Sequence, residues 1–121
     1  MRWLVEGWVD ADGRAVVDHE LTELASDPAL TESCDWLIGW LQALSLGEAS
    51  PEHEPALEVD GTALRFRTML DVVMIFALEE LLFDFEESAR LVVLRFARAA
   101  SGFATVSDLR IAAERWRRWE G

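Results

Sequence analysis

The stretch that decides the fold most clearly is Ala56–Arg67, with the sequence ALEVDGTALRFR. Asp60-Gly61 stands at its centre between runs in which apolar and polar residues alternate, and this pattern predicts a β-hairpin closed by a two-residue turn. The turn places two pairs of residues opposite each other: Val59 with Thr62, and Leu57 with Leu64. One face then carries Leu57, Val59, Leu64 and Phe66, and the other carries Glu58, Ala63, Arg65 and Arg67. Such alternation is typical of a half-buried antiparallel sheet.

A second Asp-Gly pair near the start of the chain predicts another hairpin. Asp12-Gly13 lies between Trp3–Asp10 and Arg14–Asp18, which both contain apolar residues. The first of these runs carries bulky side chains on both faces, so we expect a strand covered on both sides or one whose tryptophans face a partner.

Helical spacing follows between the two hairpins. The apolar residues Cys34, Leu37, Leu41 and Leu44 recur every three or four positions. The helix is predicted to end at Leu46-Gly47, because glycine readily adopts the left-handed cap conformation. A shorter helix around Leu21–Ala25 is expected to stop before Pro28, and the polar stretch 47–55 is expected to be a loop.

Three further helices are predicted in the C-terminal half. Thr68 followed by Asp71 favours a helix start, so Met69–Phe85 is expected to form a buried central helix. The β-branched Val72, Val73 and Ile75 leave a buried strand open as the alternative. Ser88–Ala100 is expected to continue as a helix. The last helix is predicted from Ser107, with Val106 and Ile111 as a hydrophobic staple and an inner stripe of Leu109, Ala112, Ala113 and Trp116.

These elements predict an α+β fold in which an antiparallel sheet built from two hairpins is packed by about four helices. The chain has 121 residues, of which 51% are hydrophobic. This size and composition are typical of one folded domain, so we expect residues 1–121 to form a single domain.

Charge is distributed unevenly along the chain. The net charge is −12, with 20 acidic residues and 4 arginines in residues 1–87, and 3 acidic residues and 7 arginines in residues 88–121. An acidic surface accelerates association with basic proteins and repels nucleic acid and anionic membranes, so neither of the last two is an expected partner. The C-terminal arginines are expected to pair with the protein's own carboxylates, including Arg118 with Glu114.

Residue sets typical of catalysis are absent from the sequence. His19 and His53 are its only histidines, and no glycine-flanked nucleophile accompanies them. Cys34 is the sole cysteine and is expected to be buried and unreactive. We therefore expect a protein without enzyme activity, metal or cofactor. The densest acidic cluster, Glu79, Glu80 and Asp84, keeps a small carboxylate-metal hydrolase open as an alternative.

No targeting or membrane signal is visible in the sequence. Glu6 interrupts the N-terminal apolar residues, and the longest apolar run, Val72–Leu78, is too short to span a bilayer. We expect a cytoplasmic protein. Lysine is absent and arginine supplies every basic residue, which suggests a GC-rich bacterial genome.

Six tryptophans are the least ordinary feature of the composition. Tryptophan is enriched at protein interfaces, so we expect some of these rings to contact a partner. Trp36 and Trp116 are assigned to the core. The candidate partner-binding residues are Trp8, Trp40, Glu52, Glu54, Glu79, Glu80, Asp84 and Trp119.

Acidity, tryptophan content and the missing catalytic groups together favour one function. We expect a small acidic binding protein that neutralises a basic partner such as a toxin or nuclease, in the manner of an immunity protein or antitoxin. A subunit or adaptor of a larger assembly is the alternative from another class, and a homodimer stays open.

Overall fold

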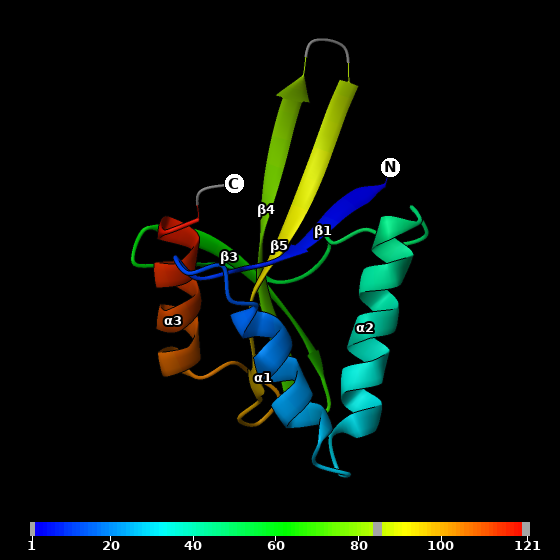
Figure 1. Ribbon diagram of the computed structural model, residues 1–121, viewed down its shortest axis with the longest axis vertical. Coiled ribbons are helices and arrows are strands. Elements are labelled where there is room, and N and C mark those ends of the chain that lie inside the picture. The colour runs from blue at the N-terminus through cyan, green and yellow to red at the C-terminus, as the bar shows by residue number, and fades with distance from the viewer. Residues whose placement is uncertain (1, 84–85, 120–121) are drawn as a thin grey trace.

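The computed structural model describes residues 2–83 and 86–119, and it describes side chains for all of these except residues 80–83 and 86–88. Within these residues lie five strands and three helices, which confirms the α+β class (Figure 1). The elements are β1 (Trp3–Gly7), α1 (Val16–Ala25), α2 (Thr31–Ser45), β2 (Ala56–Val59), β3 (Thr62–Met69), β4 (Val72–Phe83), β5 (Glu86–Arg98) and α3 (Val106–Arg117). The strands form one mixed sheet in the order β1-β5-β4-β3-β2, in which β1 runs parallel to β5.

The hairpin predicted over Ala56–Arg67 is confirmed in its register. Val59 pairs with Thr62, and Leu57 pairs with Leu64. Asp60 and Gly61 have φ angles of 50° and 79°, the left-handed values that a type I′ turn requires at both central positions. The Asp-Gly pair therefore sets the turn, and the turn sets which side chains face the core.

The hairpin predicted at Asp12-Gly13 is wrong, because the chain turns there into a helix. The Asp10 carboxylate accepts hydrogen bonds of 2.9 Å from the backbone N–H groups of Asp12 and Arg14. Gly13, at φ 77°, completes the turn, and α1 begins at Val16. Side-chain bonds of this kind stabilise a local turn without a second strand. The strand β1 pairs with β5 instead.

Both helices predicted between residues 69 and 100 are wrong as well. Met69–Phe85 contains β4, as the open alternative allowed, and Ser88–Ala100 falls in β5; these two strands form a long antiparallel hairpin (Figure 1). Thr68, expected to start a helix, pairs with Val73 across the sheet. Where the helices pack on both sides of the sheet, Val72–Ala77 of β4 is buried without interruption, and so are residues 91–94 of β5. Both faces are apolar there, and the period-2 alternation disappears.

The helices lie on two faces of the sheet. The Trp40 ring of α2 lies 5.7 Å from the Phe76 ring of β4, and the two rings are tilted against each other by 50°. On the opposite face Asp108 of α3 binds Arg95, whose register partner on β4 is Ile75. Helix α1 runs alongside β5 beyond the end of β1 (Figure 1). The core lies between these layers.

At two helix ends, a few neighbouring residues determine where the helix stops or starts. Gly47 has a φ of 76°, and the N–H groups of Gly47 and Glu48 bond back to Leu44 and Ala43, which closes α2 where the sequence predicts. At α3 the N-cap is Thr105, whose hydroxyl oxygen accepts a hydrogen bond from the Asp108 N–H.

The hydrophobic staple predicted for α3 is wrong. The cap stands two residues earlier than the staple of Val106 and Ile111 requires, and Val106 is exposed. Further along the helix Ala112 and Ala113 are buried and Leu109 and Trp116 pack against the core, as the predicted stripe requires.

Among the described residues, no helix combines the length and apolarity that crossing a bilayer requires.

Candidate protein-binding surface

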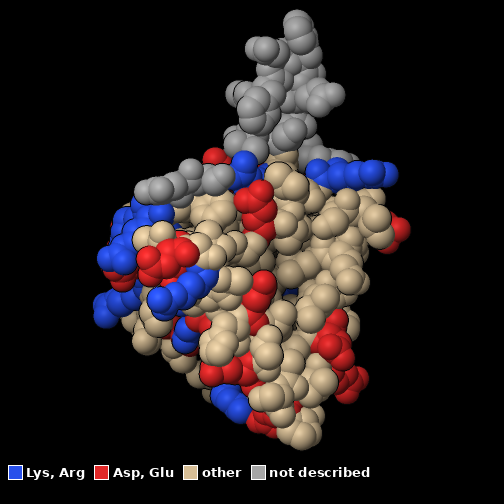
Figure 2. Space-filling model, viewed as in Figure 1, with Lys and Arg blue, Asp and Glu red and all other residues tan. Residues whose placement is uncertain are grey.

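One continuous segment of the chain, residues 15–64, contains no arginine or lysine. It builds α1, α2, the following loop and the β2 side of the hairpin. Figure 2 shows that most blue arginines gather on the side of α3, while red carboxylates appear across the face drawn, on the side of α2 and also among the arginines. The segment carries eleven acidic residues: Asp18, Glu20, Glu23, Asp27, Glu32, Asp35, Glu48, Glu52, Glu54, Glu58 and Asp60.

Some of these carboxylates are compensated by arginines from elsewhere in the chain. Glu20, Asp27 and Glu54 bind arginines, and Glu23 contacts the His19 ring at 3.3 Å. The other seven side chains are exposed, and no described arginine lies within ion-pair distance of them. They are Asp18, Glu32, Asp35, Glu48, Glu52, Glu58 and Asp60. Four of them belong to α2 and the loop that follows it, so negative potential remains open to solvent there.

The outer stripe of α2 combines acidic and aromatic side chains. Glu32, Asp35, Trp36 and Gly39 are all exposed, and their spacing of three, four and seven residues places them along one helix face. The opposite stripe is buried, with Cys34, Leu37 and Leu44 at 0% exposure. Since burial of the inner stripe fixes the rotation of the helix, the outer stripe must face solvent.

Trp36 is held in place on its inner side by an arginine. The guanidinium of Arg67 lies 4.6 Å from the centroid of the Trp36 ring and 4.5 Å from that of the Trp40 ring. The Glu54 carboxylate, from the loop after α2, forms an ion pair with the same guanidinium. These contacts join Phe76, Trp40, Arg67 and Trp36 in that order, with the Trp40 and Phe76 rings tilted against each other, and the four side chains are called the stack below.

The loop beneath this stack is also anchored. Arg65 donates hydrogen bonds from Nη1 to the carbonyl oxygens of Glu52 and Glu54, at 2.9 and 3.0 Å. Arg65 and Arg67 are alternate residues on one face of β3, as the hairpin pattern predicts. The acidic loop is thus fixed against the sheet, and the Glu52 side chain stays exposed.

Exposure among the tryptophans differs from the sequence-based assignment. Trp36, assigned to the core, is 42% exposed, while Trp8, assigned to an interface, is only 9% exposed and packs under the Arg115 guanidinium. Trp40 and Trp119 are half-buried. The spacing of apolar residues in the sequence does not predict that Trp36 is exposed. Its ring packs against Arg67, which is 31 residues further along the chain, and not into the apolar core.

The structure divides the predicted partner-binding residues between two faces. Trp40, Glu52 and Glu54 lie with α2 and its loop. Trp8 and Trp119 line a groove of about 960 Å³ at the other face. Glu79 lies on β4 and faces Arg90, which also contacts Glu6. The side chains of Glu80 and Asp84 lie outside the described part of the structure.

The basic C-terminal segment is bound to the protein's own carboxylates, as predicted. Arg118 pairs with Glu114 at 2.7 Å. Arg98 donates a 2.6 Å hydrogen bond to Asp27, and this bond, with one from the Ala29 N–H, holds the pKa of the Asp27 carboxyl below its usual value. Both pairs are largely exposed, so they contribute little to stability, and they leave the acidity of residues 15–64 largely uncompensated.

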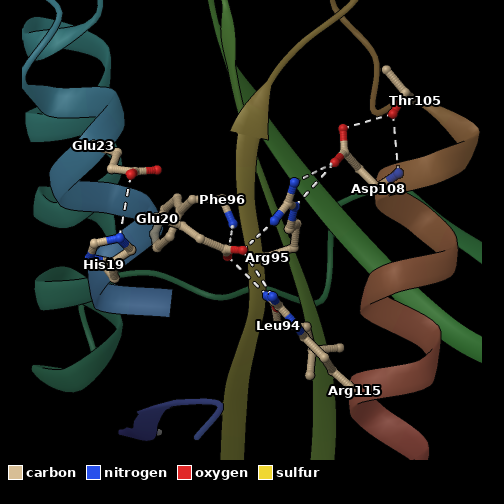
Figure 3. Close-up of polar contacts among 9 residues, drawn as sticks. All are labelled: His19, Glu20, Glu23, Leu94, Arg95, Phe96, Thr105, Asp108 and Arg115. Atoms are coloured by element: carbon tan, nitrogen blue, oxygen red, sulfur yellow. Dashed lines mark hydrogen bonds and ion pairs between the residues drawn. The ribbon is translucent and has the colours of Figure 1, made fainter. Parts of the chain in front are cut away.

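A more deeply placed network links α1, β5 and α3 (Figure 3). The Glu20 carboxylate accepts hydrogen bonds from Arg95, from Arg115 and from the Phe96 N–H. Arg115 also donates a 2.7 Å bond to the Leu94 carbonyl. Leu94 is the extra residue of a β-bulge, because Ile75 pairs with Arg95 and Phe76 pairs with Val93. The network therefore satisfies backbone groups that the sheet leaves unpaired.

A reactive centre is usually built from clustered metal ligands or from an activated nucleophile. In the part of the chain that is described, no three histidine, cysteine or acidic side chains come together as metal ligands. Cys34 is fully buried; burial, and secondarily the Asp35 carboxylate, raise the pKa of its thiol. A buried thiol with a raised pKa is a poor nucleophile, which agrees with the prediction for this cysteine.

Comparison with known proteins identifies no relative of this chain. Neither the family models, nor the curated proteins, nor the solved structures contain a match to this chain.

Proposed function

We propose that this protein binds a basic protein partner through the acidic surface of residues 15–64, and that it acts as a neutralising protein of the immunity or antitoxin type. The observation that carries the proposal is the outer stripe of α2, where Glu32 and Asp35 flank an exposed tryptophan. Carboxylates attract a basic partner over a distance, and a partly exposed tryptophan supplies apolar contact area once the surfaces meet. The proposed location of this activity is the cytoplasm.

The charge arrangement supports capture in particular. Seven exposed carboxylates lie in a segment without any arginine or lysine. Clustered charge of one sign raises association rates with an oppositely charged protein by ten-fold or more, and salt weakens this effect. A neutralising protein needs fast association, because its target must be bound before the target acts.

The experiment is affinity capture of the tagged full chain from its native cell extract at low salt, followed by identification of the eluted proteins. The proposal predicts one basic protein in near-equal amount, released as the salt concentration rises. The matched control is the variant Glu32→Gln/Asp35→Asn/Trp36→Leu, which is expected to capture much less of the same protein. Recovery of this chain alone would count against the proposal.

One observation favours the alternative of a subunit in a larger assembly. Leu70, Phe103 and Val106 are 69%, 64% and 63% exposed. The turn and the segment that carry the first two are joined by a 2.8 Å bond from the Ala99 N–H to the Asp71 carbonyl, so Leu70 and Phe103 belong to the same end of the sheet. Exposed apolar clusters mark protein contacts. Sedimentation of the wild type and of Phe103→Ser tests it: concentration-dependent association lost in the variant would support this alternative.

A further inference from the structure

We propose that the outer side of Trp36 is the binding position for an arginine side chain of the partner, with Glu32 and Asp35 as its carboxylate contacts. This inference rests on the proposed function and specifies the chemistry of its central contact. It would extend the stack of Phe76, Trp40, Arg67 and Trp36 by one further guanidinium.

The inner side of Trp36 already shows that its ring accepts a guanidinium. Arg67 lies 4.6 Å from the ring centroid, well within the distance at which a cation is attracted to an aromatic face. The stack ends at Trp36, which is 42% exposed, while Trp40 on the inner side of Arg67 is half-buried. The chain therefore uses one side of the Trp36 ring and leaves the other part of the ring in contact with solvent.

The acidic neighbours of Trp36 favour a cationic occupant over an apolar one. Glu32 lies one helical turn before Trp36 on the same face, and Asp35 directly precedes it. No described arginine compensates either carboxylate. A guanidinium stacked on the ring can donate hydrogen bonds to a carboxylate at its edge, as the Glu54 carboxylate and the Trp40 ring together hold Arg67.

The chemistry of the guanidinium favours arginine over lysine as the occupant, and the surface beside the ring is open to a long side chain. A guanidinium is planar and weakly hydrated, so it stacks on an indole ring and keeps its in-plane donors free for carboxylates. Gly39, three residues after Trp36 on the same stripe, is exposed, and a Cβ built there meets no atom within 4 Å. The low surface beside the ring gives a long side chain of the partner room to approach.

The test uses two short peptides, one with two arginines among glycines and its twin with two lysines, titrated into the intact protein. Binding is followed through the indole N–H signals in nuclear magnetic resonance spectra, with the Trp36 signal assigned from Trp36→Phe. We expect saturable displacement of the Trp36 signal, and affinity for the arginine peptide about two- to five-fold above that for the lysine peptide. Trp36→Leu should abolish this preference.

A matched pair of charge variants separates local contact from the general field. Glu32→Gln/Asp35→Asn and Glu58→Gln/Asp60→Asn each remove two exposed negative charges, and only the first pair flanks Trp36. The inference predicts the larger loss of affinity for the first pair. Equal losses, equal binding of both peptides, or an unmoved Trp36 signal would overturn it. If Trp36→Leu still captures a basic protein from extract, the inference fails and the proposed function stands; if the wild type captures none, the proposed function itself fails.

Discussion

The substitution Glu20→Gln is predicted to destabilise the fold strongly, because Glu20 joins three elements. Its carboxylate is 12% exposed and binds Arg95 and Arg115, which are 24% and 14% exposed. It also accepts the Phe96 N–H, a backbone donor at the part of β5 that lies beyond its pairing with β1. The neutral amide keeps the size of the side chain and removes the charge that the two guanidinium groups require.

The expected loss can be bounded from both sides. Removing one partner of a fully buried ion pair costs about 3–5 kcal/mol, and an exposed pair contributes about 0–1 kcal/mol. The groups here are mostly buried, but Arg95 retains Asp108 and Arg115 retains the Leu94 carbonyl. We therefore expect Glu20→Gln to lower the free energy of unfolding by about 2–3 kcal/mol, a large share of the ~5–15 kcal/mol typical of a domain.

Urea unfolding followed by circular dichroism measures this loss. At a typical slope of about 1–3 kcal/mol per molar urea, the midpoint should fall by about 0.7–3 M. The control is Glu23→Gln on the same helix, where the carboxylate is 72% exposed and contacts only His19; its effect should stay within about 0.5 kcal/mol. A loss below about 1 kcal/mol for Glu20→Gln, or equal losses for both variants, would refute the structural role assigned to this network.

Further predictions concern the helices and the buried thiol. Gly39→Ala should raise the free energy of unfolding by about 0.5–1 kcal/mol in urea titrations, because alanine favours the helix and its Cβ meets no atom within 4 Å. Thr105→Ala should lower it by about 1 kcal/mol through loss of the α3 cap, and Thr105→Ser should restore most of this. The raised pKa of the Cys34 thiol means that the unfolded chain loses its proton first as pH rises, so stability should decrease above about pH 8.5 by up to ~1.4 kcal/mol per pH unit. Cys34→Ala should make the unfolding curves measured over that range less pH-dependent, and an unchanged slope would contradict the assignment.

The parts of the fold that the sequence predicts correctly are those set by local chemistry. The register of the β2–β3 hairpin follows from Asp60-Gly61 because two successive left-handed residues permit one turn geometry. The end of α2 at Gly47 follows for a related reason. In both cases a few neighbouring residues are sufficient to determine the structure.

The elements that the sequence mispredicts depend on distant contacts. The sequence predicts helices where β4 and β5 form. Their central residues are buried on both faces of the sheet, so apolar and polar residues do not alternate there as in a half-buried strand. Asp12-Gly13 predicts a hairpin because nothing local shows that β1 pairs with β5, some 86 residues further along the chain. A tertiary contact of this kind overrides a turn signal.

The candidate site was predicted only in part, for a similar reason. Overall acidity indicates a basic partner, but it does not locate the surface. The exposure of Trp36 depends on its packing against Arg67 of β3. Two sequence signals point to this surface nevertheless: the absence of arginine and lysine from residues 15–64, and the helical spacing of Glu32, Asp35 and Trp36. Neither signal shows by itself that the ring stays in contact with solvent.

The most direct test of the central claim measures the affinity of the captured basic partner for the purified wild type and for Glu32→Gln/Asp35→Asn/Trp36→Leu over a range of salt concentrations. The account predicts that the wild type binds tightly at low salt, that its affinity falls as salt rises, and that the triple variant binds at least ten-fold more weakly with a shallower salt dependence. Equal affinity of both proteins for the partner at every salt concentration would contradict the assignment of binding to the outer stripe of α2.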